Sequence, residues 1–300
     1  MKREALRWRD RFGSHLESER RLSAHTYANY LRDIDALINW CDANGIESWD
    51  TLDTQQLRVF AARSHAGGLA PRSVQRRLSA VRTFVRYLQR ERVLRHDPTA
   101  EVRAPKVKRS LPDTLDVDQM SRLLEIPGSD ALAVRDRAIM ELFYSSGLRL
   151  AELIGLDLGA IDFGDRTVRV TGKGNKVRIL PVGRKAIDAL ESWLAVRTSM
   201  AAVGETALFV GRNGRRVGQR TIQTRIARWA RLQGLPVHVH PHLFRHSFAS
   251  HLLESSQDLR GVQELLGHAD IATTQVYTHL DFQHLARIYD RSHPRARKKT

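Results

Sequence analysis

Residues 240–279 read HPHLFRHSFASHLLESSQDLRGVQELLGHADIATTQVYTH. On a helix, side chains three and four positions apart share a face. His242 has this spacing to Arg245 and to His246. A further histidine and a tyrosine follow, and no other part of the sequence gathers a comparable cluster. The stretch therefore predicts short helices that bring these side chains together in one chemical centre. The candidate residues are His242, Arg245, His246, His268 and Tyr277.

Length and composition place this stretch in a globular protein of two domains. The chain has 300 residues, of which 42% are hydrophobic and 27% are charged, and a single domain is typically shorter. No apolar run is long enough to span a bilayer and the N-terminus lacks the apolar core of a signal peptide, so we expect a cytoplasmic protein. The one cysteine, Cys41, excludes an internal disulfide and a multi-cysteine metal site, and we expect it in the core.

The charge indicates the class of partner. Lys and Arg number 49 against 33 Asp and Glu, which gives a net charge of +16. The surplus is spread over both halves of the sequence, so both halves are expected to contact the same polyanion. The alternative is that the surplus charge serves solubility alone.

Residues 1–104 predict an all-α domain. Apolar residues recur at helical spacing in four segments, and Pro71 suits the first turn of the fourth. We expect Leu6, Phe12 and Leu16 on the buried face of the first helix and Thr54 as the N-cap of the third. The predicted helices are 3–21, 24–43, 54–64 and 71–90.

Arginines lie off the apolar stripe of segment 71–90, with almost no acidic residue between them. Guanidinium groups pair with phosphates and with guanine edges, so we interpret this face as a DNA contact, with a solvated charged face as the alternative. Residues 105–113 contain prolines and basic residues without helical period, which predicts a linker that tracks a DNA backbone. The expected DNA-binding residues are Arg72, Arg76, Arg77, Arg86, Lys106 and Lys108.

Residues 114–300 predict a second domain that is mainly α-helical with a small β-hairpin. The hairpin is indicated by two alternating segments, 167–171 and 176–181, on either side of a glycine-containing turn. An Asp116-x-x-Gln119 capping pattern opens the domain, and Gly147 ends a helix from residue 130 to 146. Further helices are expected at 183–200, 218–233, 241–254, 258–266, 273–279 and 282–291.

The candidate residues suit attack on a phosphodiester. That reaction needs fixed cations at the nonbridging oxygens, a proton for the leaving alkoxide and a nucleophile in line. Arg149 and Arg245 offer planar guanidinium groups that meet two phosphate oxygens, and Lys173 at the hairpin turn suits a general acid. The hydroxyl of Tyr277 could form a phosphotyrosine ester.

Five motifs together resemble the signature of the tyrosine recombinases, the phage integrase family, in their order and at comparable spacing. They are Ser-Gly-Leu-Arg149, Gly-Lys173-Gly, His242-Leu-Phe-Arg245-His246, Leu-Gly-His268 and Tyr277-Thr-His. The resemblance runs over nearly the whole chain and implies a C-shaped clamp, made of a helical SAM-like core-binding domain and a mixed α/β catalytic domain (114–300). Two residues depart from the family pattern beside catalytic positions, Ser146 and Phe244, and neither replaces a catalytic residue.

By this resemblance the chain cuts and rejoins DNA through a 3′-phosphotyrosyl intermediate and a Holliday junction. Arg149 and Arg245 hold the phosphate, Tyr277 is the nucleophile and Lys173 the general acid. His242 takes part in proton transfer, and His246 and His268 occupy supporting positions beside the phosphate. The resemblance implies no metal and no nucleotide cofactor. It also implies a dif-like DNA site, a second recombinase in a heterotetramer and an FtsK-type DNA translocase, in the resolution of chromosome dimers at cell division.

Other functions remain open on the sequence. The chain could be the integrase of a mobile element, a type IB topoisomerase or a non-catalytic DNA-binding relative, and covalent attachment to a nicked substrate separates the last of these from an enzyme. A zinc site at His242 and His246 is disfavoured because Arg245 lies between them and would repel the ion.

Overall fold

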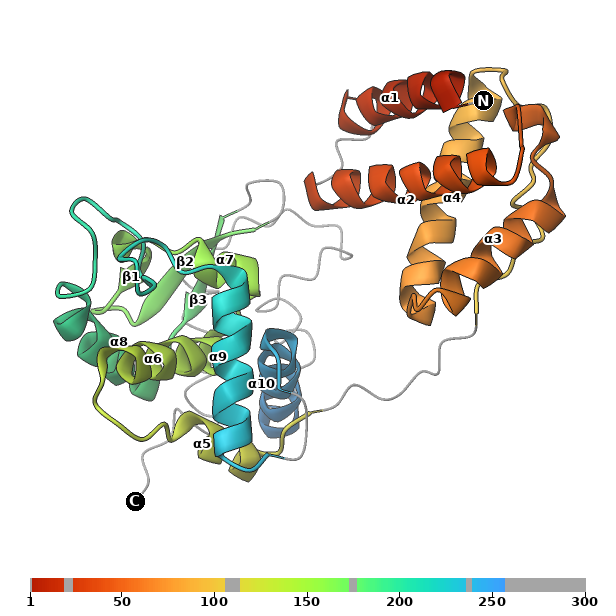
Figure 1. The fold of residues 1–300 in the computed structure, drawn as a ribbon. Helices are drawn as coiled ribbons and strands as arrows, with labels where there is room; N and C mark the ends of the chain where they lie inside the picture. Colours follow the sequence, from red (N-terminus) through yellow and green to blue (C-terminus); the bar gives the residue numbers. More distant parts are fainter. Residues whose placement is uncertain (1, 19–23, 106–113, 173–176, 236–238, 257–300) are drawn as a thin grey trace. The chain divides into compact units, whose positions relative to one another are not determined.

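The computed structural model describes residues 2–18, 24–105, 114–172, 177–235 and 239–256. The chain divides into two compact units, Met1–Arg109 and Ser110–Thr300, and each has a hydrophobic core of its own. Both are mainly helical, and the strands of one small sheet lie in the second unit (Figure 1). Among the helices of the described ranges, none combines the length and apolar character needed to cross a membrane.

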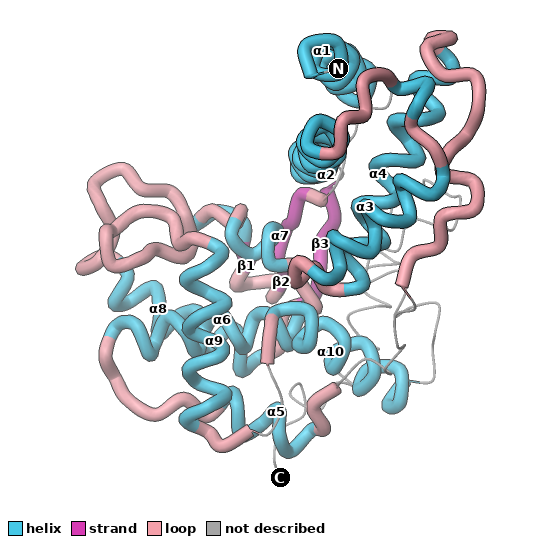
Figure 2. Tube along the Cα trace, turned by 45° about the vertical axis from the view of Figure 1, so that its right-hand side comes forward, coloured by secondary structure: helices cyan, strands magenta, loops and turns pink. Residues whose placement is uncertain are grey.

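The first unit is a bundle of four α-helices. Helix α2 packs against α1 and α4, and α3 packs against α4 (Figures 1 and 2). Phe12, Ile34 and Phe84 lie in the core that they enclose, where the rings of Phe12 and Phe84 meet edge to face with centroids 5.1 Å apart. The helices are α1 (Lys2–Ser18), α2 (Ala24–Ala43), α3 (Thr54–Ala66) and α4 (Pro71–Arg90), with a short 3-10 turn at Trp49–Thr51.

Most predicted helix boundaries in this unit are confirmed, and two details are wrong. The N-cap of α3 is Asp53, which forms a capping box with Gln56, and Thr54 is the first helical residue. Leu6 is 42% exposed, so only Phe12 and Leu16 of the three expected residues face the core. Cys41 is buried as expected, and burial raises the pKa of its thiol to about 12.

A buried carboxylate joins α2 to α4. Asp33 is fully buried and binds Arg76, and the Nε of Arg77 donates to its Oδ1 over 3.3 Å. Arg77 also donates to the hydroxyl of Ser64 on α3 over 3.0 Å. Two of the arginines expected to contact DNA therefore hold three helices of the unit together.

The second unit is organised around α6. This helix packs against α5, α8, α9, α10 and strand β3, and α7 lies beside β2 (Figures 1 and 2). The helices are α5 (Val117–Leu124), α6 (Ala131–Ser146), α7 (Leu150–Ile154), α8 (Arg184–Arg197), α9 (Gln219–Leu232) and α10 (Pro241–Ser256), and a 3-10 turn spans Leu158–Ala160.

The sheet is antiparallel with strand order β1-β2-β3. Its strands are β1 (Ile161–Asp162), β2 (Thr167–Thr171) and β3 (Val177–Pro181). The register pairs Val168 with Leu180, both buried, so the predicted hairpin is confirmed. Strand β1 was not predicted, because two residues carry no periodicity. The expected helices at 258–266, 273–279 and 282–291, and most of the expected linker, lie outside the described residues.

Removing the carboxylate of Asp33 is expected to destabilise the first unit. Asp33→Ala leaves Arg76 and Arg77 without their shared anion, which should lower the free energy of unfolding by about 3 kcal/mol. Urea-dependent hydrogen exchange in α2 and α4 measures this for the first unit alone. The matched control is Asp35→Ala, whose carboxylate is 39% exposed and binds Arg9; that change should cost less than about 1 kcal/mol. Equal losses in the two variants would contradict the assignment.

Candidate active site

Helix α10 is fixed against α6 by apolar and polar contacts. The rings of Phe244 and Phe143 lie 5.8 Å apart, and the Nδ1 of His251 lies 2.8 Å from the hydroxyl of Tyr144. The backbone N–H of Leu115 donates to the hydroxyl of Ser247 over 3.0 Å. These buried contacts determine which face of α10 packs inward, and therefore where Arg245 points.

The turn after α6 brings the second candidate arginine into place. Gly147 has a left-handed backbone with φ of 58°, which ends α6 and lets the chain reverse. The two serines before it tie the turn to the end of β3: Ser145 accepts from the N–H of Gly183 over 2.6 Å, and Ser146 donates to the carbonyl of Pro181 over 2.8 Å. Arg149 follows as the N-cap of α7.

The structure brings Arg149 and Arg245 to the same turn. The Nη1 of Arg245 donates to the carbonyl of Gly147 over 2.5 Å, across 98 positions of sequence. Arg245 is buried, whereas the side chain of Arg149 is 41% exposed. One guanidinium is thus fixed inside the site, and the other can meet a ligand from solvent.

Two charged residues that were not predicted complete this arrangement. Glu152 on α7 is buried and accepts from the backbone N–H of Arg149 over 2.8 Å and from its Nη1 over 3.0 Å. Arg178 on β3 donates from both Nη atoms to the two carboxylate oxygens of Glu152, each over 2.9 Å. We call Arg149, Arg178, Arg245 and Glu152 the guanidinium cluster.

The guanidinium cluster holds more positive than negative charge. Burial alone would raise the pKa of Glu152, but hydrogen bonds from Arg178 and from the backbone of Arg149 outweigh it and hold that pKa below its ordinary value. Burial, followed by the neighbouring charge of Arg149, lowers the pKa of Arg245 to about 10. Glu152 is therefore ionised at neutral pH, and because arginine side chains keep their charge in proteins, three cations surround one anion. This surplus of positive charge favours an anionic ligand.

The two histidines at the start of α10 lie near the guanidinium cluster. His242 and His246 are both exposed, and burial together with the charges of His242 and Arg245 lowers the pKa of His246 below its ordinary value. A neutral His246 at pH 7 can accept a proton or a hydrogen bond. No group of three His, Cys, Asp or Glu side chains within the described ranges could hold a metal ion.

The other predicted residues divide into surface groups and residues that the structure does not describe. Arg72 and Arg86 are exposed on α4, where a DNA contact remains a prediction. Outside the described residues lie Lys106, Lys108, Lys173, His268 and Tyr277. The structure thus brings together Arg149 and Arg245, with His242 and His246 on the same helix as Arg245.

Family models match both parts of the chain. The model described as "Phage integrase family" matches residues 113–284, and the one described as "Phage integrase, N-terminal SAM-like domain" matches residues 10–92. Tyrosine recombinase XerC of Pseudomonas aeruginosa PAO1 is 56% identical, with 97% of this chain and 95% of that protein covered. Tyrosine recombinase XerC of Azotobacter vinelandii is 55% identical, with 97% of each chain covered.

Solved structures share the fold at lower identity. XerH site-specific recombinase, bound to a palindromic difH substrate in a post-cleavage complex, has a TM-score of 0.71 at 23% identity and covers 93% of this chain and 84% of its own. The integrase of transposon Tn1549, in complex with a circular intermediate DNA, has a TM-score of 0.72 at 16% identity and covers 95% of this chain and 94% of its own.

Neutralising Glu152 is expected to destabilise the guanidinium cluster in a pH-dependent way. Glu152→Gln leaves Arg178 and Arg149 without a counter-charge, which should lower the free energy of unfolding at pH 7 by about 3 kcal/mol. The folded-state pKa of Glu152 is depressed, so its contribution is fully present above its ordinary value of 4.5 and is lost as the pH falls through the folded pKa.

The difference between wild type and Glu152→Gln should therefore shrink below pH 4.5. Hydrogen exchange in α7 and β3 measures it at pH 7 and at lower pH. The control is Glu191→Gln on α8, an exposed glutamate, which should change stability by less than about 0.5 kcal/mol. A pH-independent loss in Glu152→Gln would show that the carboxylate charge is not what stabilises the cluster.

Proposed function

Because the chain belongs to the phage integrase family and is a XerC-type site-specific tyrosine recombinase, a DNA breaking-rejoining enzyme, we propose that its guanidinium cluster binds the phosphodiester that is cut. One observation carries this proposal: Arg245 is buried, hydrogen-bonded to the carbonyl of Gly147, and placed with Arg149 in a cluster of three cations and one anion.

The charge of the guanidinium cluster suits the reaction. The nonbridging oxygens of a phosphodiester gain negative charge as the nucleophile attacks, and cations fixed in advance stabilise that charge most effectively. Glu152 and Arg178 position Arg149. Only the Nη1 of the Arg149 side chain is hydrogen-bonded to Glu152, so its Nη2 and Nε can bind phosphate oxygens. Arg245 is the second phosphate ligand, and its burial strengthens the interaction.

We propose the covalent step from the resemblance of the sequence motifs to those of the family. The hydroxyl of Tyr277 attacks phosphorus and forms a 3′-phosphotyrosyl bond, while the bond to the 5′-oxygen breaks and Lys173 protonates that oxygen. His242 handles the tyrosine proton, and His246 and His268 support the phosphate. The phosphotyrosyl bond retains the energy of the broken bond, so a free 5′-hydroxyl of the partner strand can attack it, release Tyr277 and give a Holliday junction without a metal or nucleotide cofactor.

The biological role is proposed from the named relatives. XerC relatives cover almost the whole chain, which favours a chromosomal recombinase over the integrase of a mobile element. The chain would act in the cytoplasm with a XerD-like recombinase in a heterotetramer, at a dif-like site, under control of an FtsK-type translocase. Both domains would contact duplex DNA, with residues 105–113 as the linker between them and Arg72, Arg86, Lys106 and Lys108 at the DNA backbone.

Loss of the tyrosine hydroxyl should abolish covalent attachment. A duplex nicked beside the cleavage point traps the cut state, so the full chain with its partner recombinase should form a protein–DNA adduct visible on a denaturing gel. Tyr277→Phe should form none while it retains DNA binding. Intact protein that forms no adduct on its own site, with or without the partner, would contradict the proposed activity.

Replacing one phosphate-binding arginine by lysine should affect chemistry more than binding. Arg245→Lys keeps the charge, so DNA affinity should change little, but it loses the planar fork, and the cleavage rate should fall by about 100-fold. Single-turnover cleavage and fluorescence anisotropy measure the two effects. Arg184→Lys, at an exposed position on α8, is the matched control and should leave both unchanged. Equal losses in affinity and rate would assign Arg245 to binding alone.

A further inference from the structure

A cavity in the second unit contains a second group of arginines. It lies between the N-terminal parts of α6 and α9 and the loop before α9, and its volume is about 460 Å³. Arg135, Arg212 and Arg225 line it together with Thr221. None of the described residues that line it is acidic, and none belongs to the guanidinium cluster.

The charges around this cavity do not balance. Arg135 and Arg225 share one carboxylate, that of Asp136: the Nε and Nη2 of Arg135 donate to its Oδ1 over 3.1 and 2.7 Å, and Arg225 binds its Oδ2. The indole of Trp229 donates to the same Oδ2 over 2.8 Å, so Asp136 is saturated. Asp136 compensates one of the two positive charges of Arg135 and Arg225, so one remains uncompensated. Arg212 adds a further positive charge.

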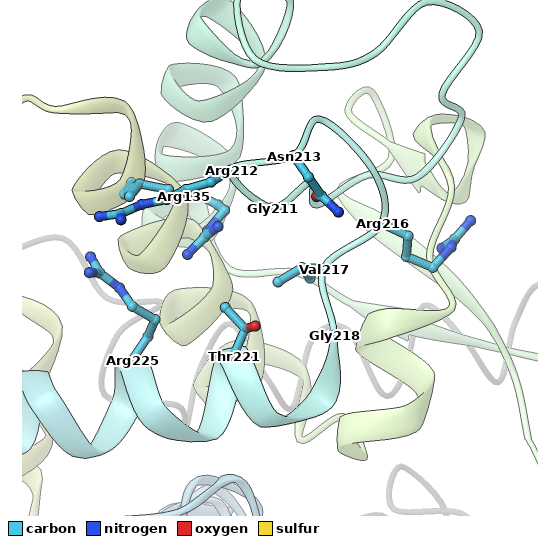
Figure 3. A pocket seen from close by; sticks show the side chains of 10 residues that line it. Arg135, Gly211, Arg212, Asn213, Arg216, Val217, Gly218, Thr221 and Arg225 are labelled. Atoms are coloured by element: carbon cyan, nitrogen blue, oxygen red, sulfur yellow. The ribbon is translucent and has the colours of Figure 1, made fainter.

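Two guanidinium groups retain donors for a ligand. In the part of the chain that the structure describes, Arg225 uses only its Nε, and Arg212 has no hydrogen-bond partner. Figure 3 shows Arg225 and Thr221 rising from α9 toward the side of the cavity where Arg135 and Arg212 lie. Arg216 also lines the cavity, but its guanidinium donates to the carbonyls of Ile154 and Leu156 and to the carboxylate of Asp157. The free donors of Arg212 and Arg225 therefore line one space.

The side chain of Arg225 and the loop that carries Arg212 are held before a ligand arrives. The guanidinium of Arg225 lies 5.6 Å from the ring centroid of Trp229, and its side chain is mostly buried. Arg212 belongs to a closed loop, in which Gly211 donates to the carbonyl of Arg215 over 2.8 Å. Gly214 has φ of 74°, and a Cβ there would come within 2.8 Å of the backbone of Met200 and Ala202, so the loop is seated tightly. The preorganised donors of Arg225 therefore lose little entropy on binding.

We propose that this cavity is a phosphate-binding site, with Arg212 and Arg225 as the ligands and the Thr221 hydroxyl as a further donor. Guanidinium forks match phosphate oxygens, and the surplus positive charge matches a phosphate monoanion or dianion. The group can belong to the DNA backbone outside the cleaved step or to a free phosphate compound. The site is additional to the proposed cleavage chemistry and does not depend on it.

Binding of a DNA backbone phosphate in this cavity is tested with the full chain on a duplex that carries its recombination site. Fluorescence anisotropy from 50 to 200 mM KCl, roughly the range over which such contacts respond, gives the salt slope of log K. Arg212→Gln removes an exposed side chain that has no hydrogen-bond partner among the described residues, so the variant is expected to fold normally. Arg225→Lys keeps the charge beside Asp136 but loses the fork. If a backbone phosphate binds here, Arg212→Gln should lower the salt slope by about 1 relative to wild type.

Binding of a free phosphate compound in this cavity is tested by thermal unfolding. The melting temperature is measured in inorganic phosphate and in ADP and compared with that in chloride at equal ionic strength. If a free phosphate compound binds here, the wild type should gain thermal stability that both variants lose, with the DNA salt slope unchanged. Arg184→Gln on α8 is the control for removal of one exposed positive charge.

Either result supports the site and identifies its source. The proposal is overturned if the variants match wild type in both measurements, or if Arg184→Gln reproduces the loss seen in Arg212→Gln. Adduct formation on the nicked duplex is recorded separately, because it reports on the cleavage chemistry and not on this cavity.

Discussion

The buried carboxylate of Glu152 determines where the positive charge of the site lies. Glu152 receives Arg178 through both of its oxygens and Arg149 through one side-chain nitrogen and the backbone. Without this anion, Arg149, Arg178 and Arg245 would repel one another around the turn at Gly147. With it, two of them have fixed positions, and the net surplus that remains is what a phosphodiester can neutralise.

The same arrangement recurs elsewhere in the fold. In three places within the described part of the chain, a buried acidic side chain is shared by two arginines, so that it joins separate elements and leaves one positive charge uncompensated. The sets are Asp33 with Arg76 and Arg77, Asp136 with Arg135 and Arg225, and Glu152 with Arg149 and Arg178. A chain with a net charge of +16 thus uses arginine both as an internal connector and as a source of positive potential for DNA.

The sequence predicted the helices with strong periodicity and missed what depends on tertiary contact. The bounds of α2 and α4 match the expected segments because their apolar stripes are continuous. Strand β1 was missed because it has two residues, and Leu6 was misplaced because a single apolar residue does not define a buried face. At the site, the pairing of Arg149 with Glu152 has the spacing of a helix cap, which could have identified Glu152. Arg178 had no such signal, since it lies on β3, 26 positions from Glu152, and meets that helix residue only through tertiary folding.

The acceptor that holds Arg245 belongs to the main chain. The carbonyl of Gly147 receives the Arg245 guanidinium, and no exchange of side chain can delete a carbonyl. Loss of this contact requires a change in backbone conformation, and the left-handed geometry of Gly147, with Ser145 and Ser146 bonded to the end of β3, resists such a change. Substitutions near Arg245 should therefore leave its position unchanged in most cases. Substitutions that alter the backbone of the turn at Gly147 should displace it.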